Sequence, residues 1–310
     1  MPIFTRDRIR KTGIVLAFLA GLGVAALGYA YFIEPTRLVV TRADVEVANW
    51  NRAFDGMKIV MISDIHGGSN DVDFEKIDQV VAKANEENAD LIVLLGDFIS
   101  QARDDHSELK MPIGDIAERL KPLKAEYGVF AVLGNHDIWN DAGKISSALE
   151  SRGIRVLEHE VATIDTGGAD LRILGLKDHT LVDEWAVYSK GAKRAIDNSE
   201  GTGDIIALSH SPDMIRLVTG EKHKVSDKLK VFLAGHTHGG QVWFPIIGSP
   251  MIPSSYGQQY ARGHISERGV EMFVTTGVGT SILPFRFMVP PEIAVITLRN
   301  RDEGDKGDRR

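Results

Sequence analysis

The sequence contains no cysteine among its 310 residues. This absence excludes disulfides, thiolate nucleophiles and zinc sites built on sulfur ligands. Basic residues are also fewer than acidic ones, which gives a formal net charge of -7. The first eleven residues carry a net charge of +3, which leaves -10 for the rest of the chain. An acidic body argues against a groove of lysine and arginine for nucleic acid, so no nucleic-acid partner is expected.

Charge is absent altogether from residues 12–33. A helix of this length reaches roughly 33 Å at about 1.5 Å per residue, enough to cross a hydrocarbon core of about 30 Å. The sequence therefore predicts a transmembrane helix over 12–33, preceded by a basic segment over 1–11. Because the cations precede the helix, the positive-inside rule places the following domain on the periplasmic or extracytoplasmic face of the cell membrane. The alternative is a signal peptide cleaved after Ala30, where Gly28 and Ala30 supply the small residues.

Residues 36–298 alternate between short apolar strands and amphipathic helices. The predicted strands lie at 36–48, 58–63, 91–95, 129–133, 154–157, 161–165, 171–175, 204–208, 231–234, 271–275 and 293–298. The predicted helices lie at 73–87, 113–124, 143–151 and 183–198. This alternation is typical of βαβ units and a mostly parallel sheet, so we expect one α/β domain over 36–298. Residues 299–310 are charged and repetitive, and we expect a disordered tail.

Polar side chains follow five of these strands, at the point where each strand ends. They are Asp64, His66, Asp97, Asn135, His136, Asp137, His210, His236 and His238. In open parallel sheets the functional groups collect beyond the carboxyl ends of the strands. His236 and His238 stand two positions apart, so an extended chain presents both on the same side. The sequence thus predicts that these side chains share one site.

The chemistry of these residues indicates metal binding. Carboxylates, imidazoles and an amide oxygen, without sulfur, form the ligand inventory of a two-metal site for Mn, Fe, Zn or similar divalent ions. Asp97 stands alone at its strand end and suits the role of a bridging carboxylate. Two such ions hold a shared hydroxide and stabilise in-line displacement at phosphorus.

The order and spacing of these segments resemble the calcineurin-like metallophosphoesterase superfamily. The matching segments are Asp64-Ile65-His66, Gly96-Asp97, Gly134-Asn135-His136-Asp137, His210 and Gly235-His236-Thr237-His238. Flanking residues at 210–213, 239–241, 256–260 and 284–293 are similar to the membrane-anchored YkuE/YaeI-like branch of that superfamily. The resemblance implies a four-layer α-β-β-α sandwich and hydrolysis of phosphate esters by a metal-bridging hydroxide.

The resemblance also implies a role for each site residue. One metal ion would be bound by Asp64, His66, Asp97 and His238, and the second by Asp97, Asn135, His210 and His236. His136 would be the imidazole beside the leaving group, acting as general acid or stabilising the transition state. Asp137 would orient His136 by accepting a hydrogen bond from its other ring nitrogen. Arg286 is a candidate for a contact with the substrate phosphate.

The substrate stays open among phosphodiesters, phosphomonoesters and lipid-linked pyrophosphates. One alternative is a UDP-2,3-diacylglucosamine pyrophosphohydrolase of lipid A biosynthesis, whose cytoplasmic substrate conflicts with the expected topology. Another is a membrane-tethered metal-binding scaffold without turnover, which a lost ligand or a missing His136 would favour, and neither is seen. Residues 242–253 are apolar for a loop beside such a site. They either pack onto the domain or form a wall that accepts lipid chains or touches the bilayer.

Overall fold

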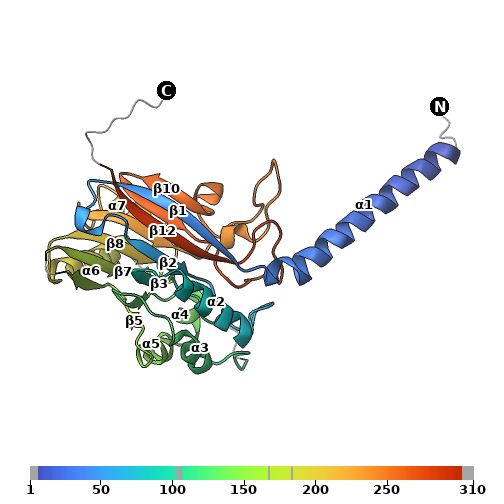
Figure 1. The fold of residues 1–310 in the computed structure, drawn as a ribbon. Coiled ribbons are helices and arrows are strands. Elements are labelled where there is room, and N and C mark those ends of the chain that lie inside the picture. Colours follow the sequence, from blue (N-terminus) through green and yellow to red (C-terminus); the bar gives the residue numbers. More distant parts are fainter. Residues whose placement is uncertain (1–5, 102, 104–106, 167, 183, 302–310) are drawn as a thin grey trace.

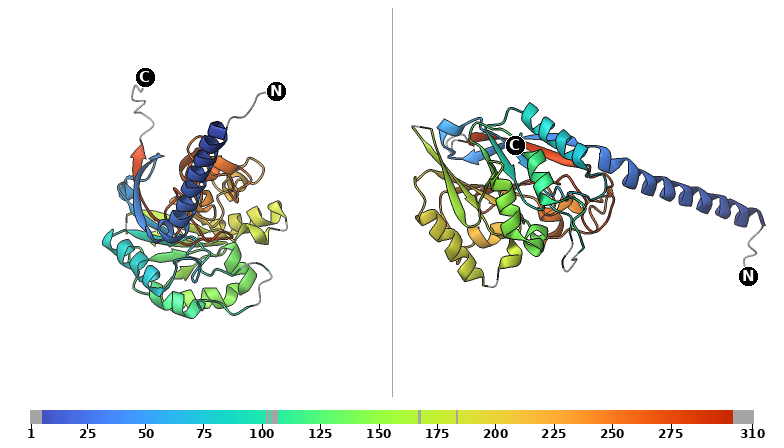
Figure 2. Two further views of the ribbon diagram at one scale, coloured as in Figure 1. Left: turned by 90° about the vertical axis from the view of Figure 1, so that its right-hand side faces the viewer. Right: turned by 90° about the horizontal axis from the view of Figure 1, so that it is seen from below.

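The computed structural model describes residues 6–101, 103, 107–166, 168–182 and 184–301. Two six-stranded mixed sheets face each other in this part of the chain, and helices cover their outer faces (Figure 1). The four-layer α-β-β-α sandwich is therefore confirmed. A long helix projects from one end of the sandwich, and two further views show that it stands clear of the domain (Figure 2).

The first sheet runs in the order β1-β12-β2-β3-β4-β5. Its strands are β1 (Val39–Ala48), β12 (Glu292–Arg301), β2 (Lys58–Ile62), β3 (Leu91–Leu94), β4 (Val129–Ala131) and β5 (Arg155–Val156). Strands β2 to β5 are parallel, as their alternation with helices predicts. Strand β12 pairs with β1 as far as Arg301, so residues 299–301 belong to the sheet and the predicted tail starts too early. Residues 302–310 lie outside the described residues.

The second sheet runs in the order β10-β11-β9-β8-β7-β6. Its strands are β10 (Gly263–Glu267), β11 (Val270–Val274), β9 (Leu229–Ala234), β8 (Asp204–Ser209), β7 (Asp170–Gly175) and β6 (Glu160–Asp165). Strands β11, β9, β8 and β7 are parallel, while β10 and β6 are antiparallel edges. The sequence did not predict β10, because Ile265 is the only large apolar residue in this half-exposed strand.

Apolar side chains from both sheets fill the space between them, including Ile59, Leu91, Ile206, Val231 and Leu233. The outer face of the first sheet is covered by α2 (Phe74–Glu86), α3 (Ile113–Leu120) and α5 (Ala142–Glu150). The outer face of the second sheet is covered by α6 (Trp185–Asp197) and α7 (Met214–Thr219). The short helix α4 (Asn135–Asn140) starts inside a site motif. Short 3₁₀ turns are η1 (Glu34–Thr36), η2 (Arg52–Phe54), η3 (His179–Leu181), η4 (His238–Gly240) and η5 (Gly257–Tyr260).

The loops beyond the strands are joined by backbone hydrogen bonds. Asp64 N–H, after β2, donates to the Gly96 carbonyl after β3 at 2.9 Å. Gly235 N–H, after β9, donates to the His210 carbonyl after β8, also at 2.9 Å. These bonds extend the pairing of parallel strands past their carboxyl ends. The polar motifs of both sheets are thereby brought to one end of the sandwich.

The projecting helix is α1 (Arg6–Phe32). It begins within the predicted basic segment 1–11, because arginine and lysine favour helices. The helix is long and apolar enough to cross a membrane by length and composition. Its foot is held by the domain, since Arg286 N–H donates to the Ala30 carbonyl at 3.0 Å and the rings of Tyr29 and Phe287 meet edge to face, 6.4 Å apart.

Candidate dimetal centre

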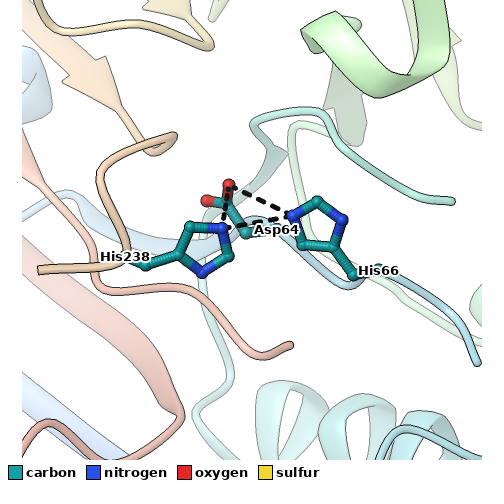
Figure 3. A group of neighbouring side chains, drawn as sticks. All are labelled: Asp64, His66 and His238. Carbon is teal, nitrogen blue, oxygen red and sulfur yellow. Dashed lines mark hydrogen bonds and ion pairs between the residues drawn. The ribbon is translucent and has the colours of Figure 1, made fainter. Parts of the chain in front are cut away.

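Asp64, His66 and His238 form one half of the centre, although 172 positions separate His66 from His238 (Figure 3). His238 Nε2 lies 3.4 Å from Asp64 Oδ1 and 3.2 Å from His66 Nε2. Asp64 Oδ1 is buried and has no hydrogen-bond partner among the described residues. A buried carboxylate oxygen is rarely left unpartnered in a folded protein, so this atom indicates a place for a cation.

Asp97 lies between the two halves. Its Oδ2 is 3.5 Å from His66 Nε2 on one side and 3.2 Å from His210 Nε2 on the other. Its Oδ1 accepts a hydrogen bond from the His136 backbone N–H at 2.9 Å. One carboxylate oxygen is therefore fixed by the backbone, while the other faces imidazoles from both sheets.

Asn135, His210 and His236 complete the second half with Asp97. His210 Nε2 lies 3.2 Å from Asn135 Oδ1 and 3.1 Å from His236 Nδ1. Ligand atoms of Asp97, His210 and His236 all lie within 4.8 Å of one another, as do those of Asp64, His66 and His238. The structure thus brings the seven candidate metal ligands close together, while their division between two metal ions stays a prediction that the resemblance implies.

Hydrogen bonds fix which ring nitrogen of two ligands faces the centre. His66 Nδ1 lies 3.1 Å from the Ile99 carbonyl and His210 Nδ1 lies 2.7 Å from the Leu95 carbonyl. Since a carbonyl only accepts, each Nδ1 carries a proton, and each Nε2 is the nitrogen that faces the centre. This is the arrangement that holds histidine ligands in metalloproteins.

The electrostatics of the site suit cation binding. Burial lowers the pKa of His66 and of His236 to about 3, so both rings are neutral ligands at physiological pH. Burial also opposes a charge on His210, yet the adjacent Asp97 carboxylate raises the pKa of this ring well above its usual range. Without a cation, a proton on His210 thus balances part of the negative charge of the aspartates.

Backbone strain is concentrated in these loops. Asp64, His66, Asp97, His236 and His238 all have positive φ, between 45° and 70°. This left-handed region costs a residue other than glycine about 1–3 kcal/mol. The glycine before His236 is also required, because a Cβ at that position would collide with Ser63 Oγ. Strain gathered on proposed ligands is typical of a functional site, since the surrounding structure must impose it.

His136 stands at the mouth of the centre. Its Nδ1 donates to the Gln101 carbonyl at 2.6 Å, which leaves Nε2 pointing inward, 4.0 Å from Asp97 Oδ2 and 3.4 Å from Ser281 Oγ. A cleft of about 650 Å³ lies above Asp97, Asn135, His136, His236 and His238. His136 is thus placed to contact a molecule in the cleft while it stays close to the bridging carboxylate.

Asp137 does not hold His136 as the sequence analysis expects. Its carboxylate accepts from the backbone N–H groups of Asp97 at 2.8 Å, Phe98 at 2.9 Å and Gly134 at 2.9 Å. The Gln101 carbonyl takes the place beside His136 Nδ1 instead. Asp137 therefore shapes the backbone around the bridging aspartate.

Arg286 does not face the cleft. The side chain is fully buried, and its guanidinium donates to the carbonyls of Gly277, Gly279 and Val289, at distances from 2.6 to 3.1 Å. Its Nη2 lies 3.4 Å from His238 Nδ1, on the side of that ring away from the centre. Arg286 therefore supports the loop behind a proposed ligand, and its buried position outside the lining of the cleft does not favour the predicted contact with a substrate phosphate.

His179 lies beside the second half of the centre, although it is not among the predicted site residues. Its ring lies 4.9 Å from the ring of His236, and its Nδ1 lies 3.0 Å from the carboxylate of buried Asp178. The pair follows β7, at the same end of the sandwich as the other motifs. That position just beyond a parallel strand was the available signal.

The match to known proteins agrees with this geometry. The family model for calcineurin-like phosphoesterases matches residues 57–240, so the chain belongs to the calcineurin-like phosphoesterase family and is a hydrolase of phosphate esters. The chain is 30% identical to metallophosphoesterase YkuE of Bacillus subtilis, over 93% of this chain and 96% of that one. It is 27% identical to phosphodiesterase YaeI of Escherichia coli, over 96% and 99%. A transmembrane protein with a metallophosphoesterase domain from Danio rerio is 26% identical, over 92% and 62%.

The contacts of Asp137 predict a loss of stability when one of its accepting oxygens is replaced by an NH₂ group. Asp137→Asn retains one accepting oxygen but turns an NH₂ group toward a backbone N–H. We expect a loss of about 1–3 kcal/mol in the free energy of unfolding, measured by urea denaturation of the metal-free chain. The exposed Asp115→Asn on α3 is the matched control. Unchanged stability with slower turnover would instead support the original assignment to His136.

The raised pKa of His210 predicts that metal binding releases protons. In the metal-free chain the Asp97 carboxylate raises the pKa of this buried ring, which favours its protonated form. A metal ion must displace the proton, so affinity falls as pH falls, by about tenfold per pH unit for each proton released. Calorimetry in buffers of different ionisation enthalpy should detect at least one proton released per chain. Release of none, with an affinity independent of pH, would contradict this description.

Proposed function

We propose that the chain hydrolyses phosphate esters with two divalent metal ions, of Mn, Fe, Zn or a similar metal. The first ion is assigned to Asp64, His66, Asp97 and His238, and the second to Asp97, Asn135, His210 and His236. The observation that carries this assignment is the position of Asp97 Oδ2 between His66 Nε2 and His210 Nε2. Unpartnered Asp64 Oδ1 supports it independently.

The donors fit hard or borderline divalent ions, because they are oxygens and imidazoles only. When bound, two such ions lower the pKa of a shared water and stabilise charge that develops on the phosphate oxygens. The chain's own contribution is to hold the ligands rigidly in place. The backbone N–H groups of His136 and His236 each donate a hydrogen bond to one carboxylate oxygen, of Asp97 and Asp64 respectively. These hydrogen bonds prevent the two side chains from rotating away from the centre.

His136 supplies the proton chemistry in this proposal. The Gln101 carbonyl holds the proton on Nδ1, so Nε2 is the atom that faces a substrate in the cleft. A protonated Nε2 would donate to the departing oxygen of the ester or to a non-bridging phosphate oxygen. Ser281 Oγ, 3.4 Å away, offers a second polar contact at the same place.

For the substrate, a phosphodiester is the first candidate. The similar Escherichia coli protein YaeI is named a phosphodiesterase, and likeness over nearly the full length supports carrying that activity over. A phosphomonoester remains compatible with the same centre. A lipid-linked pyrophosphate such as UDP-2,3-diacylglucosamine is the alternative that the apolar cleft favours. The proposed topology would place that cytoplasmic substrate on the wrong side of the membrane.

We also propose that α1 anchors the enzyme in the cell membrane, with the domain on the extracytoplasmic side. The contacts at the foot of α1 favour an anchor over a cleaved signal peptide. Cleavage after Ala30 would remove Tyr29 from Phe287 and cut the chain where its carbonyl accepts from Arg286. Fractionation of membranes and a reporter fused after residue 310 distinguish these arrangements.

Two substitutions separate metal binding from turnover. Asp97→Asn should abolish hydrolysis of bis(p-nitrophenyl) phosphate and lower metal content, because the bridging oxygen loses its charge. His136→Ala should keep its metal but turn over about 10²–10⁴-fold more slowly. Exposed His264→Ala on the edge strand β10 is the control and should match the wild type in both measurements. Metal content is read by mass spectrometry of the purified chain, and retained turnover in Asp97→Asn would refute the assignment.

A further inference from the structure

The cleft above the centre combines the polar groups of the centre with a largely apolar wall. Apolar side chains from α4 and two loops form this wall, namely Trp139, Val242, Met251, Ile282, Leu283 and Phe285. The two segments that supply most of this wall, 239–261 and 277–285, contain no charged residue. A small polar phosphate ester would leave this surface unused. The cleft therefore fits a substrate that has a charged group at one end and an apolar body at the other.

The same two segments expose large apolar side chains, of which Met251, Ile282 and Leu283 also line the cleft. We call Ile246, Ile247, Met251, Ile282 and Leu283 the lip. Ile246 is 103% exposed and Ile282 is 87% exposed, and both have positive φ, of 82° and 63°. A β-branched residue is a rare outlier in this region of backbone space. Because both isoleucines are exposed, they do not contribute to the core. Their exposure and their strained backbone together indicate a function at the surface.

The lip lies beside the foot of α1. The Phe244 ring is 5.6 Å from the Phe287 ring, which in turn contacts Tyr29 of α1. Asn70 links α1 to the segment 277–285, since its side-chain NH₂ group donates to the carbonyls of Tyr31 and Pro284. Figure 1 shows loops of the orange part of the chain on the side of the domain from which α1 departs. A bilayer that held α1 would therefore meet the lip as well.

We propose that the lip inserts into the bilayer beside α1 and that the cleft takes a phosphate ester with a hydrocarbon chain. The chain lies along the apolar wall, while the phosphate reaches the floor and the lipid keeps part of its chain in the membrane. This inference rests on the proposed hydrolytic function and on the anchoring by α1. Each methylene that leaves water favours partitioning into the bilayer by up to about fourfold, so a long-chain ester is concentrated beside the lip.

The first test reads membrane contact without turnover. Because the chain has no cysteine, Ile246→Cys, Ile282→Cys and Val187→Cys each provide one labelling site for an environment-sensitive fluorophore. Val187 is the control, since it is an exposed apolar residue on α6. In full-length chain reconstituted into phosphatidylcholine nanodiscs, labels at 246 and 282 should be quenched by doxyl lipids and protected from iodide. The label at 187 should show the reverse.

The second test compares two diesters in the same nanodiscs. Wild-type chain should hydrolyse p-nitrophenyl hexadecyl phosphate with a kcat/KM at least about tenfold above that for p-nitrophenyl ethyl phosphate. Ile246→Ser with Ile247→Ser should lower the rate on the long-chain ester about tenfold and change the rate on the ethyl ester less than twofold. Val187→Ser should leave both rates unchanged.

The outcomes separate this inference from the proposed function. Equal rates on both esters, or equal losses on both in the double variant, would overturn the lipid site while hydrolysis stands. Iodide quenching at 246 and 282 would overturn membrane insertion, and would instead favour a protein partner at the lip. Failure to hydrolyse either ester would contradict the proposed diesterase, while the fluorescence still decides whether the lip enters the bilayer.

Discussion

The site depends on two buried aspartates, Asp64 and Asp97. In each, one carboxylate oxygen accepts a backbone hydrogen bond while the other faces the centre. Asp64 accepts from the His236 backbone N–H with one oxygen, and Asp97 accepts from that of His136 with one of its own. The remaining oxygens face ring nitrogens at 3.2–3.5 Å. The hydrogen bond from His236 N–H to Asp64 joins the end of β9 to the end of β2. The same contact therefore links the two sheets and orients the Asp64 carboxylate toward the centre.

The rest of the fold keeps this arrangement in place. Five proposed ligands have positive φ angles, which are strained for residues other than glycine. An isolated loop would relax to an unstrained conformation. The buried strands that lead into each loop, and the carboxylate of Asp137 with its three backbone donors, prevent that relaxation. Arg286 does the same for the loop behind His238 by holding several carbonyls at once. These two buried side chains thus shape the backbone of the site.

The sequence predicts the parallel strands and the gathering of polar side chains at their ends, because both follow from simple rules, whereas the four layers are implied only by the resemblance to the superfamily. Apolar strands with polar ends specify a parallel sheet with a site at one edge, and His236 and His238 belong to that pattern. The sequence does not specify the direction of a side chain within a folded loop. For that reason the roles of Asp137 and Arg286 were wrong and His179 was missed. The extension of β12 to Arg301 was also missed, since its pairing with β1 depends on a partner about 250 residues away.

The central claim is that two metal ions share Asp97. Anomalous diffraction from crystals of the chain equilibrated with Mn²⁺ tests it most directly. We expect two peaks about 3.5–4 Å apart, one on each side of Asp97 Oδ2. One would lie against Asp64, His66 and His238, and the other against Asn135, His210 and His236. A single peak, or peaks that leave Asp97 uncoordinated, would contradict it.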